Sequence, residues 1–225
     1  NIYNVGEIDI SYSAFLNNKA LPESYSDFFA DGGKNIYLDN NWWGNTAENA
    51  ADSPRKGLNN WLFLNVTSNV DKLNFSENAI ITVDLANVIT SKGEISKYDA
   101  GDKLPLDTLN ITSINGIATA VSDKFIDGKL QVIFTPTATG EASVTTNLYG
   151  VTSTLKFDVS KAFTNLNIYT KDIKVKEDLV IKVALESSRP TGTVTVKINN
   201  KDYTIDLVNG TGVTTISGLT GGEYE

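Results

Sequence analysis

Carboxylates, lysines, asparagines and aromatic rings are the side chains with a candidate role in chemistry or binding in this 225-residue chain, which contains no Cys, no His and no Met. A Ser-His-Asp triad, a Cys nucleophile and a His- or Cys-ligated metal site are therefore excluded. Disulfides are excluded as well, so stability must come from burial and β hydrogen bonds. We expect no catalytic residues, no organic cofactor and a protein that is not an enzyme.

Glu7, Asp9 and Asp39 are the nearest candidates for the paired carboxylates of a polysaccharide-cleaving enzyme. Glycoside hydrolysis needs two carboxyl groups about 5–9.5 Å apart beside the scissile bond. Asp9 lies between Ile8 and Ile10, so it is expected to face outward on a strand. We interpret all three carboxylates as solvated surface residues.

A Lys, an Asn and a carboxylic acid could form an intramolecular isopeptide bond, a staple that occurs in some surface immunoglobulin-like domains without disulfides. The reaction needs a buried Lys on an early strand, a buried Asn on a late strand and an acid that moves protons between them. Lys72, Asn147 and Asp84 fit these roles by their order in the chain. Because lysine is mostly exposed in folded proteins, the alternative is that Lys72 is an ordinary surface residue.

Three tryptophans, Trp42, Trp43 and Trp61, form the most prominent aromatic group. Aromatic faces stack on sugar rings, so these residues could form a sugar-binding platform. The alternative is that they cap the open end of a stacked β-structure and pack at a junction between modules. We favour the cap, since the last layer of such a stack exposes apolar surface that large side chains must cover.

Four Asn-x-Ser/Thr triplets could accept N-linked glycans, and they begin at Asn65, Asn74, Asn110 and Asn209. Such triplets also arise by chance in a chain rich in Asn and Thr. Calcium is the one metal that the sequence could hold, since oxygen-rich loops occur at 31–33, 99–102 and 123–128. None of these loops matches an EF-hand, and turn formation alone explains Asp-Gly pairs. We assign no metal ligand.

The chain is acidic, and its basic residues are scattered. Lys and Arg total 19 against 27 Asp and Glu, which gives a net charge of −8. Binding to phosphate backbones or acidic lipids needs a clustered basic face, so nucleic acid is not an expected partner. No run of 18 apolar residues is present, so we expect no membrane insertion in this segment. The composition is typical of a solvated extracellular protein.

Short alternating strands separated by turn signals predict an all-β fold. Apolar and polar residues alternate through 79–85, 129–134, 153–159, 179–185 and 193–198. Asn-Gly, Asp-Gly and Thr-Gly pairs bound these stretches. Short strands with turns every 8–12 residues are typical of immunoglobulin-like β-sandwiches. Helical periodicity is almost absent, with 23–30 and 46–51 as the only weak candidates.

A repeat distinguishes the N-terminal part of the chain. Residues 8–15 align with 36–43 at a constant offset, which matches Ile8 with Ile36 and Phe15 with Trp43. Each copy has an aliphatic strand, then polar corner residues, then an aromatic ring, and its length suits one coil of a parallel β-helix. Asn residues at such corners tolerate left-handed backbone geometry and bond to neighbouring coils.

These patterns divide the chain into three expected modules. Residues 1–58 would be the C-terminal coils and cap of a parallel β-helix, and 59–160 would be an immunoglobulin-like β-sandwich. Residues 161–225 would be an immunoglobulin-like repeat that lacks its final strand.

Two motifs near the first expected boundary are Asn40-Asn41-Trp42-Trp43-Gly44-Asn45 and Asn59-Asn60-Trp61-Leu62. They resemble the junction, in adhesin-like surface proteins of methanogenic archaea, between a right-handed parallel β-helix and tandem bacterial-type immunoglobulin-like repeats. The stretches 190–196 and 218–224 resemble motifs of those repeats. The resemblance implies an exported archaeal cell-surface protein, without enzymatic activity, whose partners are other cell surfaces or surface glycans.

Three functional hypotheses follow. The leading one is a non-enzymatic adhesin-like stalk that projects a recognition surface from the cell. One alternative is a structural surface-layer or filament subunit that assembles with neighbouring copies of itself by β-strand exchange, since open edges accept added strands. Another alternative is a carbohydrate-binding or polysaccharide-cleaving β-helix protein.

Overall fold

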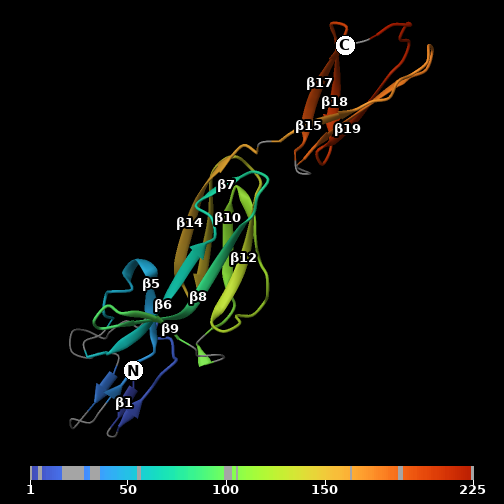
Figure 1. Ribbon diagram of the computed structural model, residues 1–225. Helices are drawn as coiled ribbons and strands as arrows, with labels where there is room; N and C mark the ends of the chain where they lie inside the picture. The colour runs from blue at the N-terminus through green and yellow to red at the C-terminus, as the bar shows by residue number, and fades with distance from the viewer. Residues whose placement is uncertain are drawn as a thin grey trace. The chain divides into compact units, whose positions relative to one another are not determined.

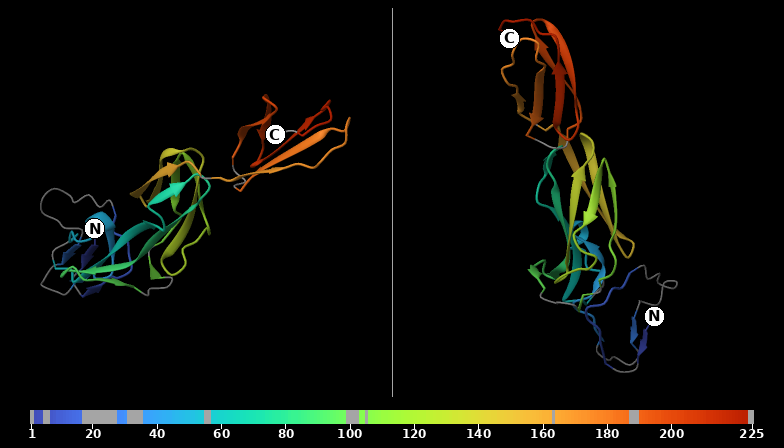
Figure 2. Two further views of the ribbon diagram at one scale, coloured as in Figure 1. Left: turned by 45° about the horizontal axis from the view of Figure 1, so that its top comes forward. Right: turned by 90° about the vertical axis from the view of Figure 1, so that its right-hand side faces the viewer.

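The computed structural model describes residues 2–4, 7–16, 28–30, 36–54, 57–98, 103–104, 106–162, 164–186 and 190–223. Over these residues the regular structure is β-strand apart from the 3-10 turn η1 (Ala47–Asn49) and a single 3-10 residue, Lys103, so the predicted all-β class is confirmed. The turn lies within the weak helical signal at 46–51, whereas the described part of the signal at 23–30 is a strand. The chain divides into two compact units, Asn1–Ser160 and Lys161–Glu225 (Figures 1 and 2).

Two sheets form the body of the first unit. One sheet has the order β11 (Gly116–Ala120), β12 (Lys129–Pro136), β8 (Ala79–Thr90), β6 (Asn60–Ser68) and β5 (Trp42–Thr46), with β9 (Ile95–Lys97) also paired to β8. The other sheet has the order β10 (Asn110–Ile114), β13 (Gly140–Leu148), β14 (Val151–Ser160) and β7 (Lys72–Asn74). Within these two sheets, the β5–β6 and β14–β7 pairs are parallel and the other pairs are antiparallel.

The two sheets share one apolar core, because inward residues alternate with outward ones along their strands. In β12, Leu130, Val132 and Phe134 are buried while the residues between them are exposed. Phe134 stacks on Phe157 of β14 with the ring centroids 5.2 Å apart, so this contact joins the two sheets. The β-sandwich expected from the alternation is therefore present.

Turn residues bound the strands at the predicted pairs. Asn115 and Asp127 have positive φ angles of 56° and 49°, which short polar side chains tolerate. Gly116 follows Asn115 at the start of β11, where an added Cβ would overlap the ring of Phe134. This glycine therefore lets the turn pack directly on the core.

Parallel strand pairs precede the sandwich in the first unit. They join β1 (Ile2–Asn4) with β3 (Phe28–Ala30) and β2 (Ile8–Asp9) with β4 (Ile36–Tyr37). Ile8 lies opposite Ile36, and Ala14 forms a parallel bridge with Trp42. The Ile8–Ile36 and Ala14–Trp42 pairings have the offset of the sequence repeat, so the repeat correctly predicted which residues lie side by side.

The parallel pairs and the sandwich are connected by continuous backbone pairing. Trp42 bridges Ala14 on one side and lies opposite Leu62 of β6 on the other. Strand β5 is therefore both an end strand of the larger sheet and a continuation of the parallel pairs. The boundary expected near residue 58 lies inside this compact unit, and the independent folding of 1–58 and 59–160 stays a prediction.

The second unit contains a three-stranded sheet and a hairpin over one core. The sheet has the order β15 (Leu166–Tyr169), β16 (Leu179–Leu185) and β19 (Thr211–Ile216), and the hairpin pairs β17 (Gly192–Ile198) with β18 (Lys201–Leu207). Strands from both parts supply its buried side chains, which are Ile181, Val183, Ile198, Ile205, Leu207 and Ile216. Strands β16 and β17 match the alternating stretches 179–185 and 193–198.

Candidate functional site

Two residues with left-handed backbone mark equivalent corners of the N-terminal repeat. Tyr12 has a φ of 57° and Asn40 has a φ of 59°. The backbone N–H of Tyr12 donates to the carbonyl of Asn40 over 2.9 Å, so one corner lies directly beside the other. Asn adopts this conformation readily, whereas a bulky residue such as Tyr does so only where its surroundings hold it.

Asn41 is fully buried and joins the two repeats through its side-chain amide. Its Oδ1 accepts the backbone N–H of Ser13 at 2.8 Å. Its Nδ2 donates to the carbonyls of Ile10 at 2.6 Å and Leu38 at 2.9 Å. Because a buried polar group is tolerated only when it is hydrogen-bonded, this satisfied amide fixes the register of the two repeats.

Asp39 and Asn40 extend the pattern to the next strand. The Asp39 carboxylate accepts the backbone N–H of Asn59 at 2.9 Å and its side-chain amide at 2.8 Å. Asn60 accepts the backbone N–H of Asn40 on its Oδ1 at 2.8 Å. These bonds connect residues 20 positions apart. The sequence offset from the second repeat to the next strand is therefore shorter than the offset between the two repeats.

The three carboxylates considered for glycoside cleavage have structural or solvent-facing positions. Asp39 is engaged by the backbone and side chain of Asn59. Glu7 and Asp9 are exposed, as the alternation around Asp9 predicted. Their arrangement gives no support for a polysaccharide-cleaving site.

Trp42 is fully buried and belongs to the sandwich core. Its Nε1–H donates to the carbonyl of Asn45 at 2.9 Å, so the polar edge of the indole is satisfied within the same strand. Its neighbours in this core include Leu62 and Leu64, two alternate residues of β6. The indole thus joins the end of the parallel pairs to the sandwich.

Trp61 and Trp43 belong to a second apolar cluster. Trp61 is 2% exposed, and its Nε1–H donates to the carbonyl of Ala50 at 2.9 Å. Trp43 is half-buried and stacks on Phe15 with the ring centroids 4.5 Å apart. Since Phe63 also belongs to this cluster, successive residues of β6 enter two different cores and the strand is buried on both faces.

The burial of these indoles bears on the two interpretations of the tryptophans. Trp42 and Trp61 have no ring face open to solvent, so neither can stack on a sugar in this conformation. Trp43 retains partial exposure but is covered on one face by Phe15. Their packing is of the kind that a cap or junction requires.

The structure does not bring together the residues considered for an isopeptide bond. Lys72 is exposed opposite Asp158 on β14, and Asn147 lies opposite Thr152 on the same strand. Those two β14 positions are about 20 Å apart at the rise of a β-strand. Asp84 lies on β8 in the other sheet. The pairing register therefore holds Lys72 and Asn147 apart, which favours the alternative that Lys72 is an ordinary surface residue.

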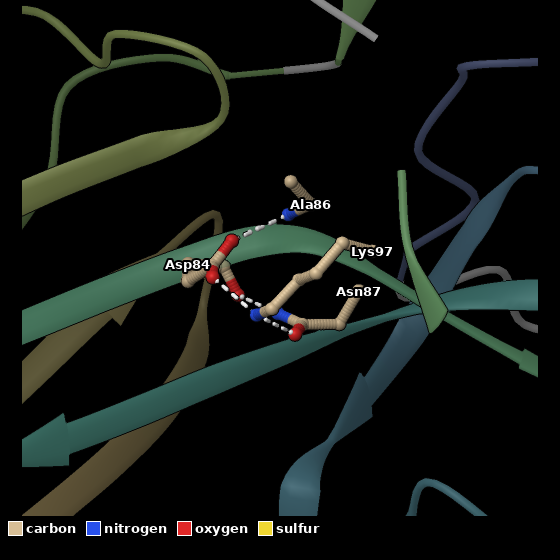
Figure 3. A network of polar contacts seen from close by, with 4 residues as sticks. All are labelled: Asp84, Ala86, Asn87 and Lys97. Atoms are coloured by element: carbon tan, nitrogen blue, oxygen red, sulfur yellow. Dashed lines mark hydrogen bonds and ion pairs between the residues drawn. The ribbon is translucent and has the colours of Figure 1, made fainter. Parts of the chain in front are cut away.

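Asp84 instead contacts a lysine and an asparagine that the sequence analysis did not single out (Figure 3). The Nζ of Lys97 lies 2.7 Å from Oδ2 of Asp84 and 2.5 Å from Oδ1 of Asn87. The other carboxylate oxygen, Oδ1, accepts the backbone N–H of Ala86 at 2.8 Å. One ammonium group thus lies between two buried acceptors.

A β-bulge in β8 accounts for this arrangement. Asn87 pairs with Phe63 of β6 and Asp84 pairs with Asn65, so three steps along β8 match two along β6. Residues three apart normally point to opposite faces of a strand, and an extra residue returns the second one to the first face. Asp84 and Asn87 are accordingly 5% and 2% exposed.

The four glycosylation triplets differ in accessibility. Asn110 is exposed on β10, and Asn209 is exposed at the turn between β18 and β19. Asn74 is half-buried, and its Oδ1 accepts the backbone N–H of Ser76 at 2.9 Å. Asn65 is half-buried within β6. The first two are therefore the accessible acceptors in the folded chain.

Metal and membrane features can be described for part of the chain. No group of three acidic side chains that could hold a metal ion occurs among the residues that the structure describes. Of the loops considered for calcium, 31–33 and 99–102 lie outside those residues, and Asp123 and Asp127 are exposed. Over the same described ranges, no helix has the length and apolar character to cross a bilayer.

No protein-family model and no curated protein matches this chain. Among solved structures, it is similar to the Yersinia pseudotuberculosis adhesin InvE at 15% identity and a TM-score of 0.34, over 68% of this chain and 50% of that one. Domains 5–6 of the S-layer protein SbsC match at 12% identity and a TM-score of 0.31, over 69% and 92% of the two chains. The D0-D1 domain of intimin matches at 15% identity and a TM-score of 0.28, over 71% and 86%. The chain thus spans half the length of the InvE structure that it matches.

Proposed function

We propose that this chain is a non-enzymatic, extracellular segment of an adhesin-like cell-surface protein. Residues 1–58 would be the last coils of a parallel β-helix, and the modules that follow would form a stalk that projects a recognition surface toward other cells or surface glycans. The parallel register at the repeat offset, which continues into the sandwich sheet through Trp42, carries the proposal. The Asn-Asn-Trp-Trp-Gly motif at 40–44 supports an archaeal origin.

Stacked corners and rungs support the β-helix part of this proposal. Ile8 pairs with Ile36 on adjacent parallel strands. Ala14, Trp42 and Leu62 lie side by side on three successive parallel segments. A solenoid is built from repeats that each contact only their neighbours, and its ends need a cap. Trp42, Trp43 and Trp61 would be that cap, since they lie where the parallel pairing passes into the sandwich.

The stalk role follows from how the two parts of the first unit are joined. Strand β6 is hydrogen-bonded to β5 on one side and to β8 on the other, and it is buried on both faces. A stalk holds its outer end in a fixed direction only if its modules do not rotate against one another. A sheet and a core that both modules share restrict such rotation. The junction is therefore suited to projecting a surface rather than to opening around a substrate.

The experiment that tests this function compares the 225-residue chain with a chain extended at both ends, on a panel of glycans and whole microbial cells. Retention by the extended chain alone would support a stalk, with recognition placed elsewhere. Retention by the shorter chain would place a recognition surface within these modules and make Trp43, which is half-buried, the first target. Cleavage of any glycan by the shorter chain would contradict the non-enzymatic role.

A second candidate function is a surface-layer or filament subunit that assembles by strand exchange. The observation that favours it is in the second unit, where, over the residues described there, β17 pairs only with β18 and β15 pairs only with β16. Sheet edges left open in this way accept strands from other chains. Sedimentation of the chain over a wide concentration range tests the idea, and a strictly monomeric chain would count against it.

A further inference from the structure

We propose that Asp84, Asn87 and Lys97 form a self-crosslinking site, in which Lys97 and Asn87 become joined by an amide bond. The proposal rests on the geometry of the three side chains. Lys97 Nζ lies 2.5 Å from Oδ1 of Asn87 and 2.7 Å from Oδ2 of Asp84 (Figure 3). The nucleophile, Lys97 Nζ, therefore contacts both the oxygen of an amide carbonyl and a carboxylate that can transfer protons, which are the groups that acyl transfer requires.

The backbone holds the two reacting residues in register. Asn87 of β8 and Lys97 of β9 are direct partners in an antiparallel pair, so their side chains leave the sheet on the same face. The Nδ2 of Asn87 donates to the carbonyl of Asp84 at 2.8 Å, which fixes the amide with its Oδ1 on the side of Nζ. Holding reactants in this way replaces a bimolecular encounter by an intramolecular one.

The carboxyl of Asp84 is placed to move the protons of the reaction. It is 5% exposed, and one of its oxygens is fixed by the backbone N–H of Ala86. The other oxygen, at 2.7 Å from Nζ, can take a proton from the Lys97 ammonium and leave a neutral amine beside a neutral acid.

The step balances without an added reactant. The neutral Nζ attacks the side-chain carbonyl carbon of Asn87, and a C–N bond forms as the carbonyl becomes a tetrahedral oxyanion. A proton passes from Nζ through the Asp84 carboxyl to the original amide nitrogen, which leaves as ammonia when the carbonyl re-forms. Ammonia takes up the remaining proton as ammonium, and Asp84 returns to its carboxylate form. Nothing is oxidised or reduced.

The environment also sets the pace of this reaction. The Lys97 side chain is 62% exposed even though its Nζ lies between two buried acceptors. Water therefore reaches the lysine stem and stabilises the ammonium, which does not attack. We expect the bond to form after folding, over hours rather than milliseconds, and to accumulate because free ammonia is dilute.

The test is peptide mapping of the folded 225-residue chain after prolonged incubation. The mass should fall by one ammonia, about 17 Da, in most molecules. Trypsin should release peptides 73–92 and 93–103 as one linked species, because Lys97 is no longer cleaved. Detection of this linked peptide is essential, because the loss of mass alone is ambiguous. Succinimide formation at Asn115-Gly116 or Asn209-Gly210 also releases ammonia. Folded wild-type chain that yields only separate peptides would overturn the proposal.

Three variants complete the test. Lys97→Arg keeps a cation beside Asp84 but cannot form the amide, so the linked peptide should disappear. Lys92→Arg is the matched control, because Lys92 is exposed in the turn of the same hairpin and should leave cross-linking unchanged. Asp84→Asn removes the proton-transfer group, and circular dichroism would establish that the variant is folded. Undiminished cross-linking in folded Asp84→Asn would overturn the assigned role of Asp84.

Discussion

Phe15 and Trp43 stack with their ring centroids 4.5 Å apart and their ring planes inclined by 25°. The two rings belong to successive copies of the N-terminal repeat. Both pack on the apolar cluster that contains Trp61 and Phe63 of strand β6. A contact between two repeats therefore also fastens the repeats to the sandwich.

Replacing Trp43 by Ala should destabilise the first unit. Loss of the ring removes the stacking partner of Phe15 and leaves a cavity beside Trp61, and for a half-buried Trp we expect about 2–4 kcal/mol. Urea unfolding measures the change. Tyr37→Ala is the control, because Tyr37 is 47% exposed and its removal should shift the midpoint little. Equal midpoints for the two variants would contradict the packing role.

Asn41→Ala should be as harmful as a core substitution despite the small size of the side chain. It leaves the Ser13 N–H and the Ile10 and Leu38 carbonyls without their buried partner, at a loss of about 2–4 kcal/mol. Hydrogen exchange at the Ser13 amide should become faster along with the fall in melting temperature. Asn147→Ala is the control, since its hydrogen bond to Gly150 is exposed. A protected Ser13 amide in the variant would argue against the network.

Gly116→Ala tests how closely the turn approaches the core. The added Cβ would overlap the ring of Phe134, and relieving that overlap should cost about 1–3 kcal/mol. Chemical denaturation and near-UV circular dichroism would report the loss of packing around the ring. Gly221→Ala in the second unit is the comparison, because its Cβ would meet only Val175 at 3.4 Å. A neutral Gly116→Ala would mean that the sheets separate easily there.

Glycan occupancy should follow accessibility if the chain is made in a host that attaches N-linked glycans. We expect modification at Asn110 and Asn209, and little at Asn65, whose side chain is half-buried within β6. Mass spectrometry of glycopeptides measures occupancy at each position. Asn110→Gln and Asn209→Gln should remove nearly all of the added mass. Dominant occupancy of Asn65 would indicate attachment before folding.

The sequence predicted those parts of the fold that depend on short-range pattern. Alternation located β12 and β16, and the repeat placed Ile8 opposite Ile36, because stacked repeats keep identical neighbours in register. The shorter step from Asp39 to Asn59 could not be predicted in this way. It depends on a connection that contains the 3-10 turn η1.

The polar site around Asp84 was missed for a different reason. Alternation appeared to end at Leu85, whereas β8 continues to Thr90 through a bulge. A bulge breaks the two-residue period, so the alternating pattern ends before it reaches Asn87. The expected isopeptide bond has its lysine on an early strand and its asparagine on a late strand, which points to Lys72 and Asn147. The register of β8 and β9 instead pairs two nearby positions, Asn87 and Lys97.

Strand β5 (Trp42–Thr46) covers a sheet edge that could otherwise pair with other chains. It occupies the edge of β6 that the sandwich would otherwise present to solvent, where residues 61–64 of β6 are apolar on both faces. A bare edge of this kind is a template for pairing with other chains. The N-terminal repeats therefore shield the sandwich from its own copies. We expect that removing the repeats would leave a sandwich that still folds but associates with its own copies and loses solubility.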